Sequence, residues 1–483
     1  MVFLPLALFW GFAIWGLVSR KPVLLYLFFG SMPFGAFAVV PPEALGGLTF
    51  TPTPIVALLI TARMFMGQRA LAYVITSAIE ERRLMWLFAF WLVAVLTTFT
   101  MPRIFAGTVG VIPVRGLLSQ AAPLMPSTQN ISQLTYLTIS VLAVVAFSRL
   151  LQGAEMRQHA LRALCLGATM TLVTGALDYA TQFVPLEPVL APFRTASYAL
   201  LTDVEVLGAK RVVGLMPEAS SYGSVCIAML TALWFLRRAI RDERLRNRRA
   251  PLLCGGLVLF GWFSTSSATY VGLALFICMV VMEWAWRAGA LKRGAYRRRG
   301  LAAEFWLAFA GFGALTAVVA FHPAVLDPLV AMIDRMVLQK TSSSSFEERG
   351  MWTAVSWQAA LDTWGLGVGV GSTRASNFAV AVASNTGFAG AFFYAVFLLR
   401  TFTRRAHPQD AEGAAMISGI RWAYPPGFVL VLLVGTTPDP GPMVAFQYGL
   451  ITAVALAGER RAARERVARA APGPGRPAGA LPA

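Results

Sequence analysis

Long apolar stretches alternate with short polar segments along this chain, from residue 2 to about residue 457. An apolar helix of about 20 residues crosses the hydrocarbon core of a bilayer. The pattern therefore predicts an all-α, polytopic integral membrane protein with thirteen spans, within a range of 12 to 14. The predicted spans cover residues 2–18, 22–40, 53–67, 85–101, 131–151, 161–183, 221–237, 252–264, 268–286, 302–321, 378–399, 422–436 and 441–457.

Residues 1–458 form one predicted transmembrane domain, which carries two long loops, 184–220 and 322–377. In the larger loop, the spacing of apolar residues predicts an amphipathic surface helix over 323–338 and a second helix over 347–364. Residues 459–483 begin as a basic helix and then become rich in Pro, Gly and Ala, which predicts a disordered cytoplasmic tail.

Composition places the chain outside the soluble globular range: 57% of residues are hydrophobic, 13% are charged and the mean hydropathy is +0.64. The net charge of +18 could indicate a nucleic-acid partner. However, 32 of the 41 Lys and Arg residues fall in alternate loops, which is the positive-inside pattern of a membrane protein. Nucleic acid is therefore not an expected partner, whereas membrane lipid is. The exceptions, in loops predicted to be extracytoplasmic, are Arg103, Arg115, Arg194, Lys210, Arg211, Arg335, Lys340, Arg349 and Arg374.

Metal and cofactor chemistry have no support in the sequence. The four cysteines lie inside apolar spans, where a free thiol behaves as a small hydrophobe. The three histidines are scattered along the chain, so no set of metal ligands is predicted. We expect no metal and no cofactor.

Residues 210–223 read KRVVGLMPEASSYG and lead into a predicted span. The N-terminus of a helix presents free N–H groups and a partial positive charge to an anion, and Lys210 and Arg211 add full charges. Glu218 lies at the predicted helix start. The alternative is that Glu218 and its neighbours cap the helix while the basic pair contacts lipid phosphate. Candidate ligand-binding neighbours are Ser220, Ser221 and Tyr222.

Residues 264–270 read STSSATY and interrupt an apolar stretch at the outer end of a predicted helical hairpin. The hydroxyl groups of Ser264 and Ser266 are candidates for binding a polar ligand. The alternative is structural, because hydroxyl groups also satisfy backbone groups where a membrane helix is broken.

Residues 346–390 place Arg349 and Arg374 on either side of the glycine-rich sequence GLGVGVGS. A guanidinium grips phosphate oxygens through two parallel N–H bonds, which suits a diphosphate. Glycines such as Gly367 and Gly369 allow backbone N–H groups to approach a ligand. The alternative is a surface ion pair of Arg349 with a neighbouring glutamate, together with glycines that serve close packing.

The order of these motifs resembles that of the bacterial O-antigen ligase and polysaccharide polymerase family. GLMPEASSYG is followed by STSSATYVGL, then by ERGMWTAVSWQAALDTWGLGVGVGSTR and a span with NTGFAG. The most specific part is the arrangement of Arg349, Trp352, Gly365 and Gly367. The resemblance covers mainly residues 205–395 and implies a GT-C-like membrane fold.

By this resemblance, an undecaprenyl-diphosphate-linked oligosaccharide binds at the extracytoplasmic face, and its glycan is transferred without a nucleotide sugar or a metal. Arg211 and Arg349 match the arginines that hold the diphosphate, and Arg374 is a further candidate. The histidine that ligases carry after the glycine sequence is absent from residues 372–385. This absence favours a polymerase, with Glu218 as the base for the acceptor hydroxyl and Arg349 as its catalytic partner.

The resemblance thus implies a glycosyltransferase of exopolysaccharide or O-antigen biosynthesis in the bacterial inner membrane, with its active site facing the periplasm. Other polysaccharide export proteins are candidate partners. Three alternatives stay open at this point: an O-antigen ligase, a transporter or flippase of lipid-linked glycans, and a non-catalytic scaffold. A transporter predicts charged residues at mid-membrane and two pseudo-symmetric halves, whereas this sequence gathers its polar residues at one face.

Overall fold

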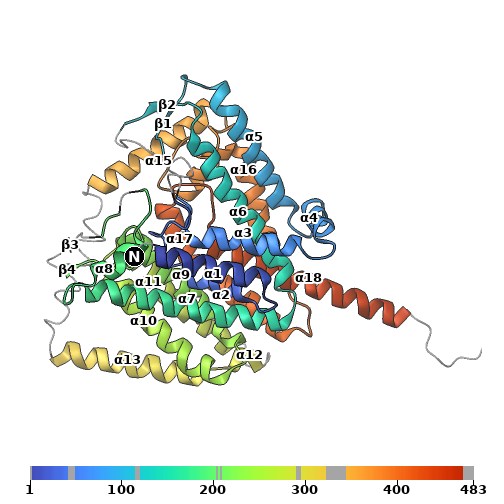
Figure 1. The fold of residues 1–483 in the computed structure, drawn as a ribbon. Helices are drawn as coiled ribbons and strands as arrows, with labels where there is room; N and C mark the ends of the chain where they lie inside the picture. The colour runs from blue at the N-terminus through green and yellow to red at the C-terminus, as the bar shows by residue number, and fades with distance from the viewer. Residues whose placement is uncertain are drawn as a thin grey trace, which may run out of the picture.

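The computed structural model describes residues 3–41, 49–114, 120–198, 200–202, 205–206, 209–289, 295–321 and 344–470. Helices account for 74% of the structure and strands for almost none. The predicted all-α membrane class is therefore confirmed (Figure 1). The predicted amphipathic helix 323–338 and the end of the tail, 471–483, lie outside the described residues.

The first half of the chain contains α1 (Phe3–Val18), α2 (Val23–Gly30), α3 (Pro52–Phe65), α4 (Ala70–Ile79), α5 (Met85–Ile104), β1 (Gly110–Val111), β2 (Ala122–Pro123), α6 (Thr128–Leu150), α7 (Ala154–Ala180), α8 (Glu187–Leu190), η2 (Ala191–Phe193), β3 (Glu205–Val206), β4 (Ala209–Lys210) and α9 (Ala219–Leu236). The second half contains η3 (Arg237–Ala239), η4 (Leu245–Arg249), α10 (Ala250–Phe263), α11 (Ser267–Gly289), α12 (Ala295–Arg298), α13 (Leu301–Phe321), α15 (Ser344–Asp362), α16 (Phe378–Thr403), α17 (Ala411–Val434) and α18 (Pro442–Ala470). The strands form two small antiparallel pairs, β1 with β2 and β3 with β4.

Among the described residues, eight helices are long and apolar enough to cross a membrane, or nine if α3 and α4, which meet at 109°, form one broken span. The predicted count of 12 to 14 is higher than the structure supports. The helices α1, α2 and α10 have only 16, 8 and 14 residues. The chain is a multi-pass membrane protein, but several of its apolar stretches are short helices.

Two of the short helices end for identifiable reasons. Helix α2 stops at Gly30 because the next residues turn, and Pro33 within that turn has no N–H with which to continue a helix. Helix α10 ends before Thr265, whose φ of 45° lies in the left-handed region. Helix α11 starts at Ser267 on the far side of this break, so the two helices form a hairpin.

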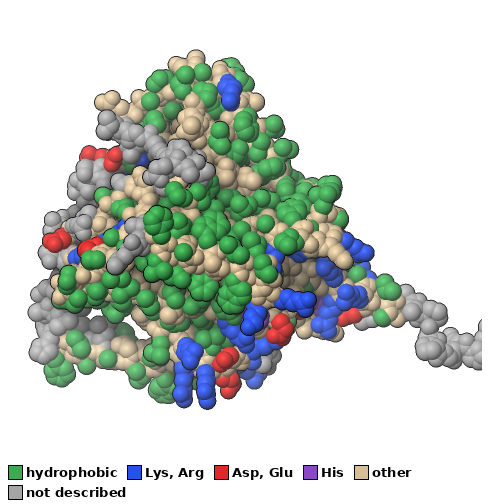
Figure 2. All heavy atoms as spheres, in the orientation of Figure 1, with side chains coloured by type: hydrophobic (Ala, Val, Ile, Leu, Met, Phe, Trp, Pro, Cys, Tyr) green, Lys and Arg blue, Asp and Glu red, His purple; other side chains and the backbone are tan. Residues whose placement is uncertain are grey.

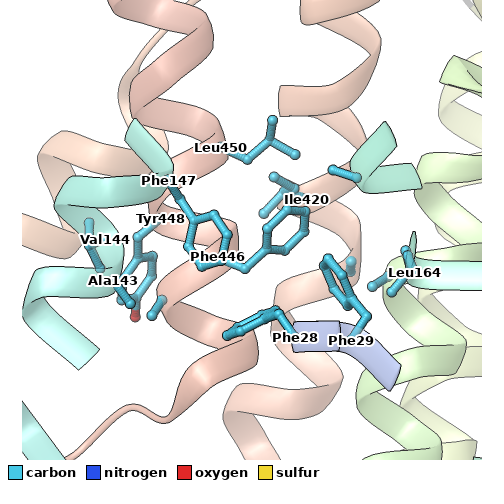
Figure 3. Packing of buried hydrophobic residues seen from close by; sticks show 14 of the residues in the cluster. Phe28, Phe29, Ala143, Val144, Phe147, Leu164, Ile420, Phe446, Tyr448 and Leu450 are labelled. Carbon is cyan, nitrogen blue, oxygen red and sulfur yellow. The ribbon is translucent and has the colours of Figure 1, made fainter. Parts of the chain in front are cut away.

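The core is built from helices that are distant in sequence. Helix α6 packs on α18, α5 on α16, α2 on α7, and α9 on both α10 and α17. At the centre, Phe28 meets Phe147 edge to face with ring centres 4.9 Å apart, and Phe29 meets Phe446 in the same way at 4.9 Å (Figure 3). Such pairs contribute roughly 0.5–1.5 kcal/mol beyond their buried area.

The two ends of the helical bundle differ in character. Helix α8, strands β3 and β4 and helix α15 lie at one end, which we call the loop face (Figure 1). The opposite end, where α18 leaves the bundle, carries most of the visible Lys and Arg side chains (Figure 2). We call it the basic face. Hydrophobic side chains cover much of the surface between them, as expected where a protein meets lipid.

The loops agree with the sequence predictions in part. The predicted helix 347–364 is α15, which runs from Ser344 to Asp362. The predicted basic helix at residue 459 is the continuation of α18, which runs without a break to Ala470. The predicted span 422–436 starts much earlier, because α17 begins at Ala411.

Candidate functional site at the loop face

The segment before α9 is held in place by a single buried carboxylate, that of Asp178 near the end of α7. It accepts hydrogen bonds from the N–H groups of Val213 at 2.7 Å and Gly214 at 3.0 Å, and from Arg194 at 2.9 Å. Gly214 has a φ of 59°, a conformation that favours glycine. These bonds fix the direction in which the chain enters α9.

Lys210 belongs to the same anchoring network. Its ammonium group donates to the Thr181 hydroxyl at 2.6 Å and lies 3.3 Å from the Asp178 carboxylate. The charge of Lys210 is therefore compensated within the protein. This arrangement favours a structural function for Lys210, and its predicted part in ligand binding stays a prediction.

Glu218 is the N-cap residue of α9, with extended backbone angles, but its side chain makes no capping hydrogen bond. Instead, its carboxylate accepts a hydrogen bond from the Ser220 hydroxyl. The carboxylate is half-buried beside the helix N-terminus. The capping interpretation of Glu218 is therefore not supported by its hydrogen bonds.

Arg211 reaches across to the break between α10 and α11. Its guanidinium donates to the Thr265 hydroxyl at 3.0 Å, to the Thr265 carbonyl at 3.1 Å and, at 3.4 Å, to the Ser264 carbonyl. Thr265 is a β-branched residue at φ 45°, a conformation that costs about 1–3 kcal/mol and is found mainly where the surrounding structure enforces it. The strained turn thus holds Arg211 through neutral oxygen atoms, and no carboxylate in the described ranges forms an ion pair with it.

Arg374 and Arg349 lie together at α15. The guanidinium carbon of Arg374 sits 3.6 Å from the centre of the Trp352 ring, a cation–π contact, and its Nε is buried without a hydrogen-bond partner. Arg349 precedes Trp352 by one helical turn and is half-buried. It forms no ion pair with Glu347 or Glu348, so the surface ion pair considered from the sequence is not formed.

Electrostatic interactions link Arg211 and Arg374 to the same carboxylate, that of Glu218. Burial lowers the pKa of the Arg211 guanidinium, and the charge of Glu218 opposes that shift. Burial also lowers the pKa of Arg374; the carboxylates of Glu348 and Glu218 oppose the shift, and Arg349 adds to it. One carboxylate, Glu218, is therefore near enough to act on arginines from two different loops.

We refer to Arg211, Glu218, Arg349 and Arg374 as the loop-face cluster. None of its three arginines lies within ion-pair distance, 4.0 Å, of any carboxylate that the structure describes. Glu218 acts on Arg211 and Arg374, and Glu348 also acts on Arg374, so three guanidinium charges exceed the two nearby carboxylate charges. A site with net positive charge suits an anionic ligand.

The N–H groups of the glycine-rich sequence were predicted to approach a ligand, but in the structure they bond to the protein. Gly365, Gly367, Gly369 and Gly371 all have φ between 76° and 88°. The N–H of Gly367 donates to the Thr363 hydroxyl at 3.1 Å, and that of Gly369 donates to the Asn385 carbonyl at 3.0 Å. Both groups are thus engaged by the protein.

Close packing explains why these positions are glycine. A Cβ on Gly367 would lie 2.4 Å from the backbone nitrogen of Gly387, and one on Gly369 would lie 3.0 Å from the Cα of Thr98. Gly387 itself has a φ of 70° and breaks α16 at this contact. The structure favours the packing interpretation, in which the glycines hold the segment before Arg374 against α5 and α16.

The remaining predicted residues surround the cluster or support it. Tyr222 is buried and donates to the Thr171 carbonyl at 2.9 Å, so it braces α9 against α7. Ser264 is buried and donates to the Gly261 carbonyl at 2.7 Å, and Ser266 is also buried. Ser221 is half-buried in the first turn of α9.

Sequence reasoning did not single out Thr265, although it named both neighbours of this residue. A signal was present, since two consecutive helices that form a hairpin require a break between them, and the residue at that break makes the contacts of the turn. Nothing in the sequence around Asp178, two residues before the end of α7, indicated that its carboxylate would hold the loop before α9.

No cluster of three His, Cys, Asp or Glu side chains that could hold a metal ion occurs in the described part of the chain. No family model, curated protein or solved structure matches the chain. The resemblance to polysaccharide polymerases, and the GT-C-like fold that it implies, therefore stay predictions.

Proposed function

We propose that this chain is a metal-independent glycosyltransferase of the polysaccharide polymerase type, which uses an undecaprenyl-diphosphate-linked glycan as donor. The observation that carries the proposal is the loop-face cluster: three arginines with no described carboxylate within ion-pair distance, of which Arg211 and Arg374 interact electrostatically with Glu218 at a helix N-terminus and Arg349 lies beside Arg374. Such a site provides positive charge for a leaving diphosphate and one carboxylate for an attacking hydroxyl.

In the proposed reaction, a hydroxyl oxygen at the non-reducing end of one lipid-linked unit attacks the anomeric carbon of another. The new carbon–oxygen bond forms as the bond from that carbon to the diphosphate breaks. The diphosphate leaves with the bonding electron pair, and Arg349, Arg374 and Arg211 stabilise its negative charge. Glu218 accepts the proton of the attacking hydroxyl.

A second feature supports a polyprenyl donor. A cavity of about 810 Å³ with almost wholly apolar walls lies between α1, α2 and α7, and Phe37 and Phe193 line it at the loop face. Next to Phe37, the N–H of Ala36 donates to the Leu215 carbonyl at 2.9 Å, three residues before Glu218. In this proposal the cavity accommodates part of the isoprenoid chain while the diphosphate reaches the cluster.

The proposed location is the bacterial inner membrane, with the loop face toward the periplasm. The test uses a bacterium that makes the polymer, in which Glu218→Gln replaces the native chain at matched expression. We expect loss of polymer and accumulation of single lipid-linked repeat units. Accumulation of finished polymer on its lipid would assign the chain as a ligase, and repeat units confined to the inner leaflet would assign it as a flippase. Normal polymer would contradict the proposed site.

A further inference from the structure

A second cationic site lies at the basic face, far from the loop-face cluster along the helices. A cavity of about 380 Å³ opens between α2, α3, α6 and the start of α7. Three arginines line it, Arg20 from the α1–α2 connection, Arg63 from α3 and Arg149 from α6. The rest of its wall is mainly apolar and includes Leu24, Leu25, Ile60, Met64, Ala146, Leu150 and Met156. We call it the basic-face cavity.

Within the described ranges, no carboxylate pairs with the arginines of this cavity, and the Arg149 guanidinium carbon lies 5.5 Å from the centre of the Tyr73 ring. Arg63 donates to the carbonyl groups of Gly16 at 2.6 Å and Ser19 at 2.5 Å, where α1 ends. Arg149 donates to the Gln68 carbonyl at 2.6 Å, and its Nη1 atom is buried without a hydrogen-bond partner. Neutral carbonyls fix both guanidiniums in place, but no described carboxylate lies within 4.0 Å of either one or of Arg20.

The surroundings strengthen the positive field. Arg149 also lines a neighbouring cavity of about 590 Å³, whose other charged residues are Arg69, Arg83, Arg460 and Arg464. Of these four, Arg83 is partly neutralised, since it pairs with Glu80 at 2.5 Å. A buried guanidinium nitrogen without a hydrogen-bond partner, close to other positive charges, raises the free energy of the folded protein unless a bound anion accepts its hydrogen bond.

We propose that the basic-face cavity binds an anionic membrane phospholipid. Its phosphate would lie among Arg20, Arg63 and Arg149, and one acyl chain would lie against Leu24 and Ile60. Two properties select a lipid over a soluble phosphate compound. The wall of the cavity is mainly apolar, and the cavity lies at the end of α6, a helix long and apolar enough to cross a membrane, where lipid head groups are expected. The charge selects an anionic lipid over a zwitterionic one.

The test measures lipid retention by native mass spectrometry on the purified full-length chain in detergent. Phosphatidylglycerol and phosphatidylcholine with identical acyl chains are added separately. We expect tighter retention of phosphatidylglycerol. Each of Arg20→Gln and Arg149→Gln should weaken that retention by about fivefold, the effect of one basic residue at a lipid surface. Arg20 is exposed and makes no described side-chain hydrogen bond, so its replacement leaves the fold intact.

Two variants serve as controls. Arg149→Lys keeps the charge and should retain most of the affinity. Arg244→Gln removes an exposed arginine outside the cavity and should change nothing. Equal retention of both lipids, or equal losses in Arg20→Gln and Arg244→Gln, would overturn the proposal. Displacement of phosphatidylglycerol by millimolar inorganic phosphate would assign the cavity to a soluble anion and would also overturn it. Binding is measured without any transfer reaction, so this result is independent of the proposed function.

Discussion

Two groups of arginines in this protein differ in one respect, namely whether the protein itself supplies the opposite charge. Toward the basic face, Arg237, Arg238 and Arg287 share two carboxylates, that of buried Glu283 and that of partly buried Glu304. Arg238 grips Glu283 with both terminal nitrogens, one at 2.8 Å, and Arg287 meets the same carboxylate at 2.9 Å. Arg237 and Arg287 both donate to Glu304. We call these five residues the paired network.

The loop-face cluster has the opposite character. Arg211 is held by two carbonyls and a hydroxyl, and Arg374 lies on an aromatic ring. None of the cluster's three arginines forms an ion pair with a described carboxylate. Removing one partner from a buried ion pair leaves an uncompensated charge and destabilises the fold. Removing an arginine that forms no ion pair in the folded protein should change the free energy of unfolding little. The comparison therefore predicts that changes in the paired network affect folding, whereas changes in the loop-face cluster affect ligand binding and catalysis.

The largest expected effect is on stability, in the paired network. Glu283→Gln should lower the free energy of unfolding by about 3–5 kcal/mol, because three buried guanidiniums then share one carboxylate. Chemical denaturation in detergent micelles measures the change. The exposed pair of Arg241 and Glu155 provides the control: Glu155→Gln should cost no more than about 1 kcal/mol. Equal costs for the two variants would mean that the network does not stabilise the fold.

The next largest effect is on catalysis, in the loop-face cluster. Arg349→Ala should lower the transfer rate by about 10²- to 10³-fold, as expected for loss of one group that stabilises a developing negative charge. The unfolding curve should stay unchanged. The measurement is polymer formation from purified lipid-linked repeat units. Arg103→Ala is the matched control, since Arg103 is an exposed arginine whose one hydrogen bond to described residues is to the Phe99 carbonyl of its own helix. A similar loss in both variants would contradict a specific function of Arg349.

An intermediate effect is expected in the glycine-rich sequence that supports Arg374. Gly369→Ala should destabilise the protein by about 1–3 kcal/mol, because a side chain is strained at φ 88° and its Cβ would press on Thr98 and Pro102. Thermal unfolding measures this cost. Gly350→Ala is the control, since nothing lies within 4 Å of a Cβ at that position in α15. If Gly369→Ala were as stable as Gly350→Ala, the packing interpretation would be wrong.

The smallest effect concerns the aromatic ring beneath Arg374. Trp352→Leu should weaken binding of a prenyl diphosphate by roughly 2- to 30-fold, the range that corresponds to a cation–π contact of 0.5–2 kcal/mol. Trp352→Tyr keeps an aromatic face and should recover most of the affinity. An equal loss in the tyrosine variant would show that the indole contributes through its size or its N–H group instead.

Much of the fold could be predicted from the apolar pattern. The spans predicted at 85–101 and 378–399 correspond to α5 (Met85–Ile104) and α16 (Phe378–Thr403), because both are long and little interrupted by charge. The start of α17 was missed because Glu412 was assigned to a loop. In the structure that glutamate pairs with Arg241 at 2.8 Å, and a tertiary ion pair of this kind leaves no periodic signal in the sequence.

The candidate site was predictable in its residue types but not in its partners. The sequence indicated Arg211, Glu218, Arg349 and Arg374 from charge, spacing and resemblance. It could not reveal that Lys210 is compensated by Asp178 while Arg349 is not compensated by its own neighbours. Whether a charge is paired depends on contacts between distant segments, and those are fixed only by the packing of the helices.

The most direct test of the account is whether the loop-face cluster recognises a diphosphate. Three purified full-length proteins are compared: the native chain, the double variant Arg349→Ala with Arg374→Ala, and Arg103→Ala. Each is titrated with undecaprenyl diphosphate and, separately, with undecaprenyl monophosphate. We predict that the native chain and Arg103→Ala bind the diphosphate at least about tenfold more tightly, since each additional charge-assisted hydrogen bond contributes about 1.5–3 kcal/mol. The double variant should lose this preference. Equal affinity for both lipids in the native chain, or an unchanged preference in the double variant, would contradict the account.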